Sequence, residues 1–126
     1  MRPVTVLVAD DEEMVREALV DALQQHAEVR VVAIAVDAAE AVQQARQLRP
    51  DVAILDVRMP AGGGPEAARG IRLHSPGTRI IAHSAFDDVE TCNAMLAAGA
   101  HEYVVKGAGM QRILRSVLGS ADGHVA

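Results

Sequence analysis

The chain has 126 residues, a length that suits one domain of ordinary size and is short for two. Half of its residues are apolar but only two are aromatic, so aliphatic side chains must build the core. The net charge of −5 argues against direct nucleic-acid binding by this domain, and the single Cys92 excludes an internal disulfide. No apolar run reaches membrane-spanning length, so we expect a cytoplasmic protein that makes no membrane contact.

Apolar runs bounded by turn residues recur along the chain and predict its strands. In chain order these runs occupy residues 4–9, 29–35, 52–56, 79–84 and 102–105. The first is almost continuously apolar, which is typical of a strand buried on both faces. Arg30, near the start of the second, indicates an edge strand. The third ends at Asp56, and Pro60 with the glycines beyond it forces a loop.

Each strand is followed by apolar residues at helical spacing. In chain order, helices are expected over residues 14–23, 37–48, 65–75, 87–99 and 110–118. Asp37 is the predicted N-cap of the second helix, and Asp87 or Asp88 that of the fourth. Gly99 and Gly119 are predicted to end the last two helices. The predicted apolar face of the fourth helix consists of Val89, Cys92, Met95 and Leu96.

Strict alternation of strands and helices predicts an α/β fold with a parallel sheet and right-handed crossovers. The expected class is a flavodoxin-like, doubly wound (βα)5 domain with a five-stranded sheet of order 2-1-3-4-5. In that order the carboxyl ends of strands one, three, four and five meet at one rim. This rim would hold Asp10, Asp11, Asp56, Ser84 and Lys106.

The residue types at this rim indicate a particular chemistry. Carboxylate oxygens in small number suit Mg²⁺, which can neutralise an incoming phosphoryl group. Asp56 would then be free to act as a nucleophile and form an aspartyl-phosphate. Lys106 offers a positive charge and Ser84 a hydroxyl to the phosphoryl oxygens. Each residue alone also has an ordinary explanation as a helix cap, a turn residue or a solvated side chain.

With these motifs the chain resembles the receiver domain of two-component response regulators over residues 3–118. The matching pieces are Asp10-Asp11, the stretch from Asp56 to Pro60, Gly64, Ser84-Ala85, and Tyr103 to Lys106. The resemblance implies that Asp56 accepts a phosphoryl group from the phosphohistidine of a sensor histidine kinase or a phosphotransfer protein. It also implies a signalling domain rather than an enzyme, with self-phosphotransfer and self-dephosphorylation as its only reactions.

The same resemblance assigns roles to the other rim residues. Mg²⁺ would be held by the carboxylates of Asp10, Asp11 and Asp56 and by the backbone carbonyl of Arg58. Ser84 and Lys106 would bind the phosphoryl group. Ser84 and Tyr103 would form the switch, which changes the surface of the fourth helix, the fifth strand and the fifth helix.

Three positions depart from the family pattern or vary within it. Gly107 follows Lys106, where many members have a cis proline, which puts the loop before the last helix in question. Arg58 and Phe86 stand where the family varies, beside the path of the hydrolytic water. Our hypothesis is that both side chains hinder this water and slow self-dephosphorylation. The alternative is that both are simply exposed loop side chains.

Two other protein classes begin from similar features. An aspartyl-phosphate phosphatase of the haloacid dehalogenase type also has an Asp at a strand end, but needs a second Asp where this chain has Arg58. A flavin-binding flavodoxin needs a hydroxyl- and glycine-rich loop after the first strand, and the acidic run beginning at Asp10 would repel its phosphate. His83, on an inner strand, is expected to be a hydrogen-bonded core histidine rather than a catalytic one.

The output of the domain is left open by the sequence. We expect residues 1–120 to form the receiver domain, and residues 121–126 to be a C-terminal tail or the start of a linker to an effector. The partner downstream is either an effector domain or a separate protein. A homodimer is also expected to be accessible, either through the fourth helix, fifth strand and fifth helix or through helices one and five.

Overall fold

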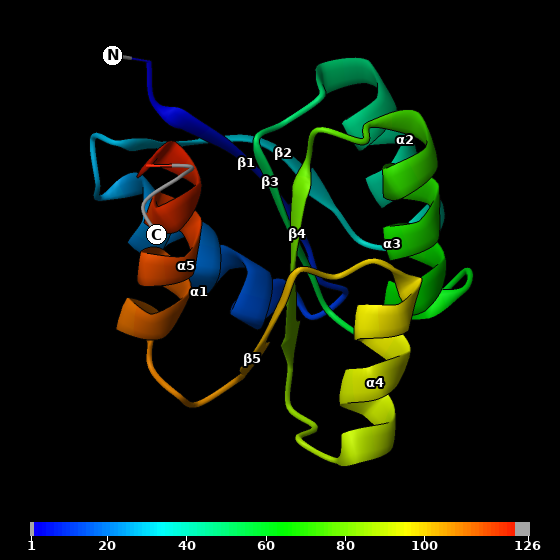
Figure 1. Ribbon diagram of the computed structural model, residues 1–126. Coiled ribbons are helices and arrows are strands. Elements are labelled where there is room, and N and C mark those ends of the chain that lie inside the picture. The colour runs from blue at the N-terminus through cyan, green and yellow to red at the C-terminus, as the bar shows by residue number, and fades with distance from the viewer. Residues whose placement is uncertain (1, 123–126) are drawn as a thin grey trace.

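The computed structural model describes residues 2–122 of the chain, with side chains from residue 2 to residue 119. Strands and helices alternate in the order β1 (Val4–Ala9), α1 (Glu13–Gln24), β2 (Val29–Ala35), α2 (Ala38–Leu48), β3 (Val52–Leu55), α3 (Gly63–His74), β4 (Arg79–Ser84), α4 (Val89–Ala98), β5 (Glu102–Val105) and α5 (Met110–Asp122). The strands form one parallel sheet of order β2-β1-β3-β4-β5, which confirms the predicted flavodoxin-like (βα)5 fold (Figure 1).

The sheet is covered by helices on both faces, α1 and α5 on one and α2, α3 and α4 on the other (Figure 1). Because successive strand residues face opposite sides, each face has its own core. Val6 and Val8 of β1 pack with Ile113 of α5, whereas Leu7 lies in the other core with Ile71 of α3. This second core is rich in alanine, so its helices lie close to the sheet, as the composition indicates.

Local signals place most helix ends where the sequence predicts them. The carboxylate of Asp37 accepts a hydrogen bond from the Glu40 amide, and that of Asp88 from the Thr91 amide, so both are N-caps. The α5 helix, in contrast, continues past Gly119 to Asp122, although Gly119 was expected to end it. A glycine costs only about 1 kcal/mol inside a helix, and nothing packs near Gly119 to impose a turn.

The predicted apolar face of the fourth helix is largely wrong. Met95 is fully buried, but Val89 is 71% exposed and Leu96 is 47% exposed. The α4 helix packs on α3 and on the short edge strand β5, so only a narrow stripe of the helix meets the core.

The neighbouring strands β1 and β3 are joined at their amino ends by a cluster of polar contacts, here called the polar clip. The Asp51 carboxylate accepts hydrogen bonds from the backbone and the hydroxyl of Thr5, and from the Arg2 guanidinium at 2.8 Å. The Thr5 hydroxyl accepts a bond from the Asp51 amide in return. The bond from Arg2 lowers the pKa of Asp51; burial opposes this shift and the bonds from Thr5 add to it. This clip lies at the end of the sheet opposite the predicted site.

Candidate functional site

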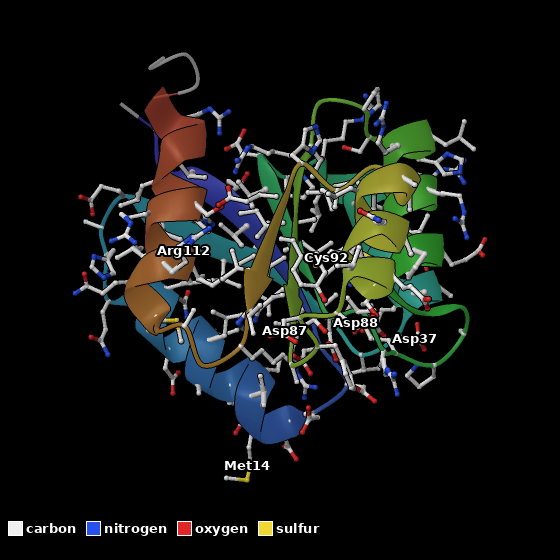
Figure 2. The ribbon with its side chains drawn as sticks, turned by 60° about the horizontal axis from the view of Figure 1, so that its bottom comes forward. Met14, Asp37, Asp87, Asp88, Cys92 and Arg112 are labelled. Carbon is white, nitrogen blue, oxygen red and sulfur yellow. The ribbon has the colours of Figure 1, made fainter. Side chains whose placement is uncertain are left out.

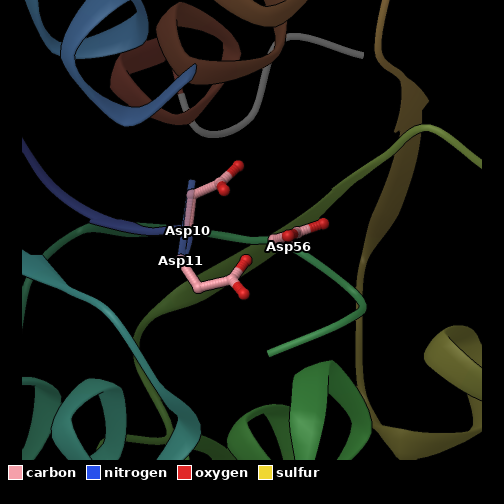
Figure 3. Close-up of side chains that lie close together, drawn as sticks. All are labelled: Asp10, Asp11 and Asp56. Carbon is pink, nitrogen blue, oxygen red and sulfur yellow. The ribbon is translucent and has the colours of Figure 1, made fainter. Parts of the chain in front are cut away.

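The predicted carboxylates do meet at the carboxyl rim of the sheet. Asp10 and Asp11 follow β1 directly, and Asp56 follows β3 (Figure 3). One carboxylate oxygen from each of the three lies within 4.8 Å of the others. Asp10 and Asp56 are buried, with 2% and 6% of their surface exposed, while Asp11 is open to solvent. Two of the three charges therefore stand largely out of water.

Backbone contacts hold Asp10 and Asp56 in place. The Asp56 amide donates to the Ala9 carbonyl at 2.9 Å, which continues the pairing of β3 with β1 beyond the strand end. The Asp10 amide donates to the Ala35 carbonyl at 3.0 Å on the other side. The Asp10 carboxylate also accepts a hydrogen bond from the Glu12 amide, which turns the chain into α1. Both side chains are thus fixed by the parallel register of neighbouring strands.

Gly64 brings the first turn of α3 directly onto the chain beside Asp56. Its amide donates to the Val57 carbonyl at 2.7 Å. A β-carbon at this position would stand 2.8 Å from the Asp56 carbonyl oxygen and from the Val57 α-carbon. Such distances are shorter than backbone atoms accept, so only glycine lets the helix approach this closely.

Lys106 reaches across the rim from the end of β5. Its Nζ lies 2.9 Å from a carboxylate oxygen of Asp10 and 3.4 Å from one of Asp56. A third carboxylate, that of the exposed Glu12, lies at 3.7 Å. The Lys106 amide donates to the Ser84 carbonyl, which aligns the end of β5 with β4. The lysine therefore compensates part of the buried negative charge.

The charges at the site shift one another's protonation. Burial raises the pKa of Asp56, the charge of Asp10 adds to this, and Lys106 opposes it. For Lys106, burial disfavours the ammonium, but the hydrogen bond to Asp10 and the charge of Asp56 outweigh burial and raise its pKa. One ammonium faces two buried carboxylates, so the site retains an excess of negative charge. Such an oxygen-lined, anionic site suits a hard divalent cation.

Ser84 and Tyr103 lie close to the same turn after β4. Ser84 is fully buried, and its hydroxyl oxygen accepts a hydrogen bond from the Phe86 amide at 3.1 Å. The Tyr103 hydroxyl donates to the Phe86 carbonyl, and its half-buried ring packs on the core beside α4. Both predicted switch residues are therefore bonded to the backbone of one residue.

Arg58 and Phe86 are in direct contact with one another. The guanidinium carbon of Arg58 lies 3.9 Å from the centre of the Phe86 ring, a cation–π geometry. Arg58 comes from the loop after β3, which begins at Asp56, and Phe86 comes from the loop after β4, so the pair joins these two loops. Nothing in the sequence spacing indicates this contact, although each residue was singled out separately.

Residues 6–118 match the family model of the response regulator receiver domain. The chain belongs to this family. Among similar proteins, the receiver shares 39% identity over 114 residues with the DNA-binding transcriptional activator DevR/DosR of Mycobacterium tuberculosis, covering 90% of this chain and 52% of that protein. It shares 30% identity over 115 residues with the transcriptional regulatory protein LnrK of Bacillus subtilis, covering 91% and 52%. The chain spans about half the length of these relatives.

Solved receiver structures agree with this assignment. The signal receiver domain of the putative response regulator NarL from Mycobacterium tuberculosis superposes with a TM-score of 0.92 at 35% identity, covering 98% of this chain and all of that one. The response regulator domain of Thermotoga maritima CheB gives a TM-score of 0.88 at 28% identity, covering 98% and 100%. The fold and the family are therefore those expected from the rim motifs.

Two further features lie beside the site. No cis peptide bond occurs in the described residues 2–122, and Gly107, which put the loop before α5 in question, has a φ of 95° and makes a left-handed turn there. Glu12 was not singled out as a site residue, although it lies within reach of Lys106. The run of acidic residues that contains Glu12 was the sequence feature that could have pointed to it.

No helix within residues 2–122 has the length and apolar character needed to cross a membrane.

Proposed function

We propose that this receiver domain accepts a phosphoryl group on Asp56 and signals through the change that follows. The observation that carries the proposal is the contact of the Lys106 ammonium with the carboxylates of both Asp10 and Asp56. That arrangement places Asp56 near a cation that a phosphoryl oxygen can pair with. The proposed donor is the phosphohistidine of a sensor histidine kinase or of a phosphotransfer protein.

The proposed cofactor is Mg²⁺. Carboxylate oxygens of Asp10, Asp11 and Asp56 converge closely enough to hold one cation, and the backbone carbonyl of Arg58 is the proposed fourth protein ligand. When bound, the cation would neutralise charge on the phosphoryl oxygens. The hard oxygen donor set and the uncompensated negative charge at this rim both support the choice of this metal.

The transfer step uses groups of this chain. An Asp56 carboxylate oxygen attacks phosphorus and forms the new P–O bond, while the P–N bond to the donor imidazole breaks and that imidazole takes up a proton. Lys106 pairs with one phosphoryl oxygen, and the Ser84 hydroxyl donates a hydrogen bond to another. In self-dephosphorylation, water would attack the same phosphorus, the P–O bond to Asp56 would break, and inorganic phosphate would leave while the Asp56 carboxylate is restored.

The proposed switch begins at the Ser84 hydroxyl. When this hydroxyl turns to the phosphoryl group, it gives up the hydrogen bond from the Phe86 amide. Tyr103, which is bonded to the carbonyl of the same residue, is then released to turn inward. The surface made by α4, β5 and α5 would change as a result. The shared attachment of both residues to Phe86 supports this coupling.

The proposed output is the control of an effector. We place the receiver at residues 1–120 and a tail or linker at 121–126. The α5 helix extends to Asp122, two residues into this proposed tail, and residues 123–126 lie outside the described residues. The names of the relatives support a transcriptional regulator in which another domain contacts DNA. Homodimerisation through α4–β5–α5 or through α1 and α5 is part of the proposal, as is a cytoplasmic location. The comparisons give no support to the haloacid dehalogenase alternative.

Treatment with Mg²⁺ and acetyl phosphate, followed by intact mass measurement, tests the proposal. One phosphoryl group should add to the wild-type chain and none to Asp56→Asn. Asp51→Asn is the matched control, because it makes the same change at the opposite end of the sheet and should still be phosphorylated. Unmodified wild type with acetyl phosphate and with a sensor kinase, or modification of Asp56→Asn, would refute the role of Asp56.

A further inference from the structure

The short strand β5 lies at the edge of the sheet and pairs with β4. Its ladder with β4 begins at the pair of Ile81 and Glu102. Three residues before Glu102 the chain turns at Gly99, which has a φ of 122°. Ile80, the residue before this pair on β4, is fully buried. Its backbone groups need hydrogen-bond partners although the ladder has not yet begun.

His101 supplies both partners for Ile80. Its amide donates to the Ile80 carbonyl at 2.8 Å, and its imidazole Nδ1 accepts a hydrogen bond from the Ile80 amide at 3.0 Å. An amide can only donate, so Nδ1 must hold a free lone pair and the ring proton must be on Nε2. Both nitrogens of an imidazolium carry a proton, so only the neutral ring can make this bond.

Two guanidiniums lie near the imidazole of His101. Burial lowers the pKa of His101, and the charges of Arg79 on β4 and Arg72 on α3 lower it further. The side chain of Arg72 lies across Gly99, so it covers the turn that leads into His101. The α4 helix adds no charge on this side, because residues 91–100 are all uncharged. Protonation of the ring would therefore bring a third cation to this end of the sheet.

The carboxylate of Glu102, the next residue on β5, is already engaged. It accepts a hydrogen bond from Arg79 at 2.8 Å and another from the Ser116 hydroxyl of α5. It also lies 3.9 Å from Arg112, which extends from the same helix (Figure 2). Glu102 therefore anchors the start of β5 to side chains of β4 and α5, whereas the ring of His101 anchors it to the backbone of β4.

We propose that His101 is a positioning residue for β5: its neutral imidazole holds the amino end of this edge strand on β4, and protonation of the ring loosens it. The same strand carries Tyr103 and leads directly into Lys106. The consequence for these two residues rests on the proposed function, whereas the hydrogen bond does not. Because the pKa of the folded ring lies below its ordinary value of 6.5, the hold is present at neutral pH and is lost in acid.

A second histidine, His83 on β4, is also neutral at neutral pH. Only 9% of its surface is exposed, and its Nδ1 has no hydrogen-bond partner among the described residues, which corrects the prediction of a hydrogen-bonded core histidine. Burial, together with the Lys106 charge and against that of Asp10, lowers the pKa of His83 to about 4. Since both histidines titrate in acid, the tests compare chains that all retain His83.

The hydrogen bond is tested first, by NMR of the chain labelled with nitrogen-15. At about pH 7.5 the two ring nitrogens of His101 should show the signals of a neutral ring that carries its proton on Nε2. A ring that carries its proton on Nδ1, or one that exchanges between both neutral forms, would overturn the proposal.

Variants separate the hydrogen bond from the shape of the side chain. His101→Asn keeps an acceptor, because its side-chain oxygen can stand where Nδ1 stands, and it does not titrate; His101→Leu removes the acceptor. Solvent exchange of the Ile80 amide, relative to its intrinsic rate, reports the hold on β5. At about pH 7.5 His101→Asn should protect this amide as well as wild type, and His101→Leu about tenfold less. At about pH 5 wild type should lose about tenfold in protection and His101→Asn should not.

A control and a reference signal make this comparison specific. His74→Asn makes the same change at the end of α3 and should keep the wild-type response to pH. The Val6 amide in β1, read in the same spectra, should not distinguish wild type from His101→Asn, because both chains are folded alike. Equal protection of Ile80 in wild type and His101→Leu, or the same loss in acid in wild type and His101→Asn, would contradict the role of His101.

Phosphorylation by acetyl phosphate and Mg²⁺ tests the consequence for the site. Wild type and His101→Asn should react equally fast at about pH 7.5, whereas wild type should be several-fold slower at about pH 5, because Lys106 is then held less firmly. Equal rates at both pH values would show that the loosening does not reach Lys106. Failure of both chains to react would refute the role of Asp56 instead, and would leave the exchange result for Ile80 unaffected.

Discussion

At the scale of single residues, the contact between Arg58 and Phe86 gives the lifetime hypothesis a physical form. The guanidinium carbon of Arg58 lies 3.9 Å from the centre of the Phe86 ring, and the contact joins the loop that begins at Asp56 to the loop after β4. A cation–π pair at an exposed site contributes about 0.5–1 kcal/mol. Two side chains in contact would hinder the hydrolytic water more than two independent side chains, because each restricts the rotamers of the other.

We therefore expect the variant that combines Arg58→Asn with Phe86→Glu to lose its phosphoryl group several-fold faster than wild type. The decay of the phosphorylated chain after removal of the donor, followed by intact mass, measures this. Phe86→Leu is the control for the ring, since it keeps an apolar side chain and removes the cation–π contact; its decay should lie between the two. A decay that is unchanged or slower in the double variant would show that the two side chains are ordinary loop residues.

The burial of His83 makes the free energy of unfolding fall as the pH is lowered. Its pKa is about 4 in the folded chain against an ordinary value of 6.5, so folding favours the neutral ring. Above pH 6.5 the ring is neutral in both states and this penalty is absent. As the pH falls from 6.5 towards 4 the unfolded chain takes up the proton first, and the free energy of unfolding falls by up to about 3 kcal/mol.

Urea unfolding at several pH values tests this account. The wild-type chain should lose more stability than His83→Phe between about pH 7 and pH 4.5, and the difference between the two curves isolates the histidine. Parallel curves would mean that His83 is solvated in solution and has an ordinary pKa.

At the scale of elements, the first turn of α3 depends on the absence of a side chain at position 64. Gly64→Ala would press a methyl group against backbone atoms at 2.8 Å, so the helix must move away from the end of β3. We expect a loss of about 2 kcal/mol of unfolding free energy, typical of overpacking, together with slower phosphorylation of Asp56.

The matched control is Gly77→Ala, where an added β-carbon meets nothing within 4 Å. Its unfolding midpoint and its phosphorylation rate should be close to those of wild type. Equal stability of the two variants would contradict the close approach of α3 to Asp56.

The bounds of the strands could be predicted from the sequence more closely than the exposed faces and ends of the helices. Four of the five strands have the predicted bounds, because each is an apolar run that stops at a turn residue or a charge, and β3 ends one residue early, at Leu55. The predicted apolar face of α4 was wrong, because the spacing of apolar residues does not tell which side of a helix a neighbouring element covers. The end of α5 was also missed, because a glycine ends a helix only where the chain has a reason to turn.

The sequence was enough to predict which residues meet at the rim, but not the contacts between them. Parallel topology alone brings Asp10, Asp56 and Lys106 to one rim, so the alternation of strands and helices was enough to place them together. The pairing of Arg58 with Phe86 depends on the course of two loops, which no periodicity describes. The same limit applies to the bond from the Ile80 amide to His101, which depends on the turn at Gly99.

At the scale of the whole molecule, the excess negative charge at the rim links stability to divalent cations. Two buried carboxylates repel one another and are balanced by a single ammonium, so a cation that binds the folded chain alone stabilises it. At a Mg²⁺ concentration 100-fold above the dissociation constant, the gain is about 2.7 kcal/mol.

Thermal unfolding with and without Mg²⁺ measures this gain. Wild type and Asp51→Asn should both show a higher midpoint in Mg²⁺, whereas Asp10→Asn should lose most of the increase. An equal increase in Asp10→Asn would place the cation elsewhere on the molecule.

The position of Lys106 also has a practical consequence, because it is the one lysine in the chain. An amine-specific reagent has a single side-chain target here, and that target is shielded and held in its charged form among Asp10, Asp56 and Glu12. Its acylation at neutral pH should be far slower than that of a free lysine. Reductive methylation with a carbon isotope would instead place one lysine signal inside the carboxylate cluster, where its chemical shift reports each cation or phosphoryl group that arrives.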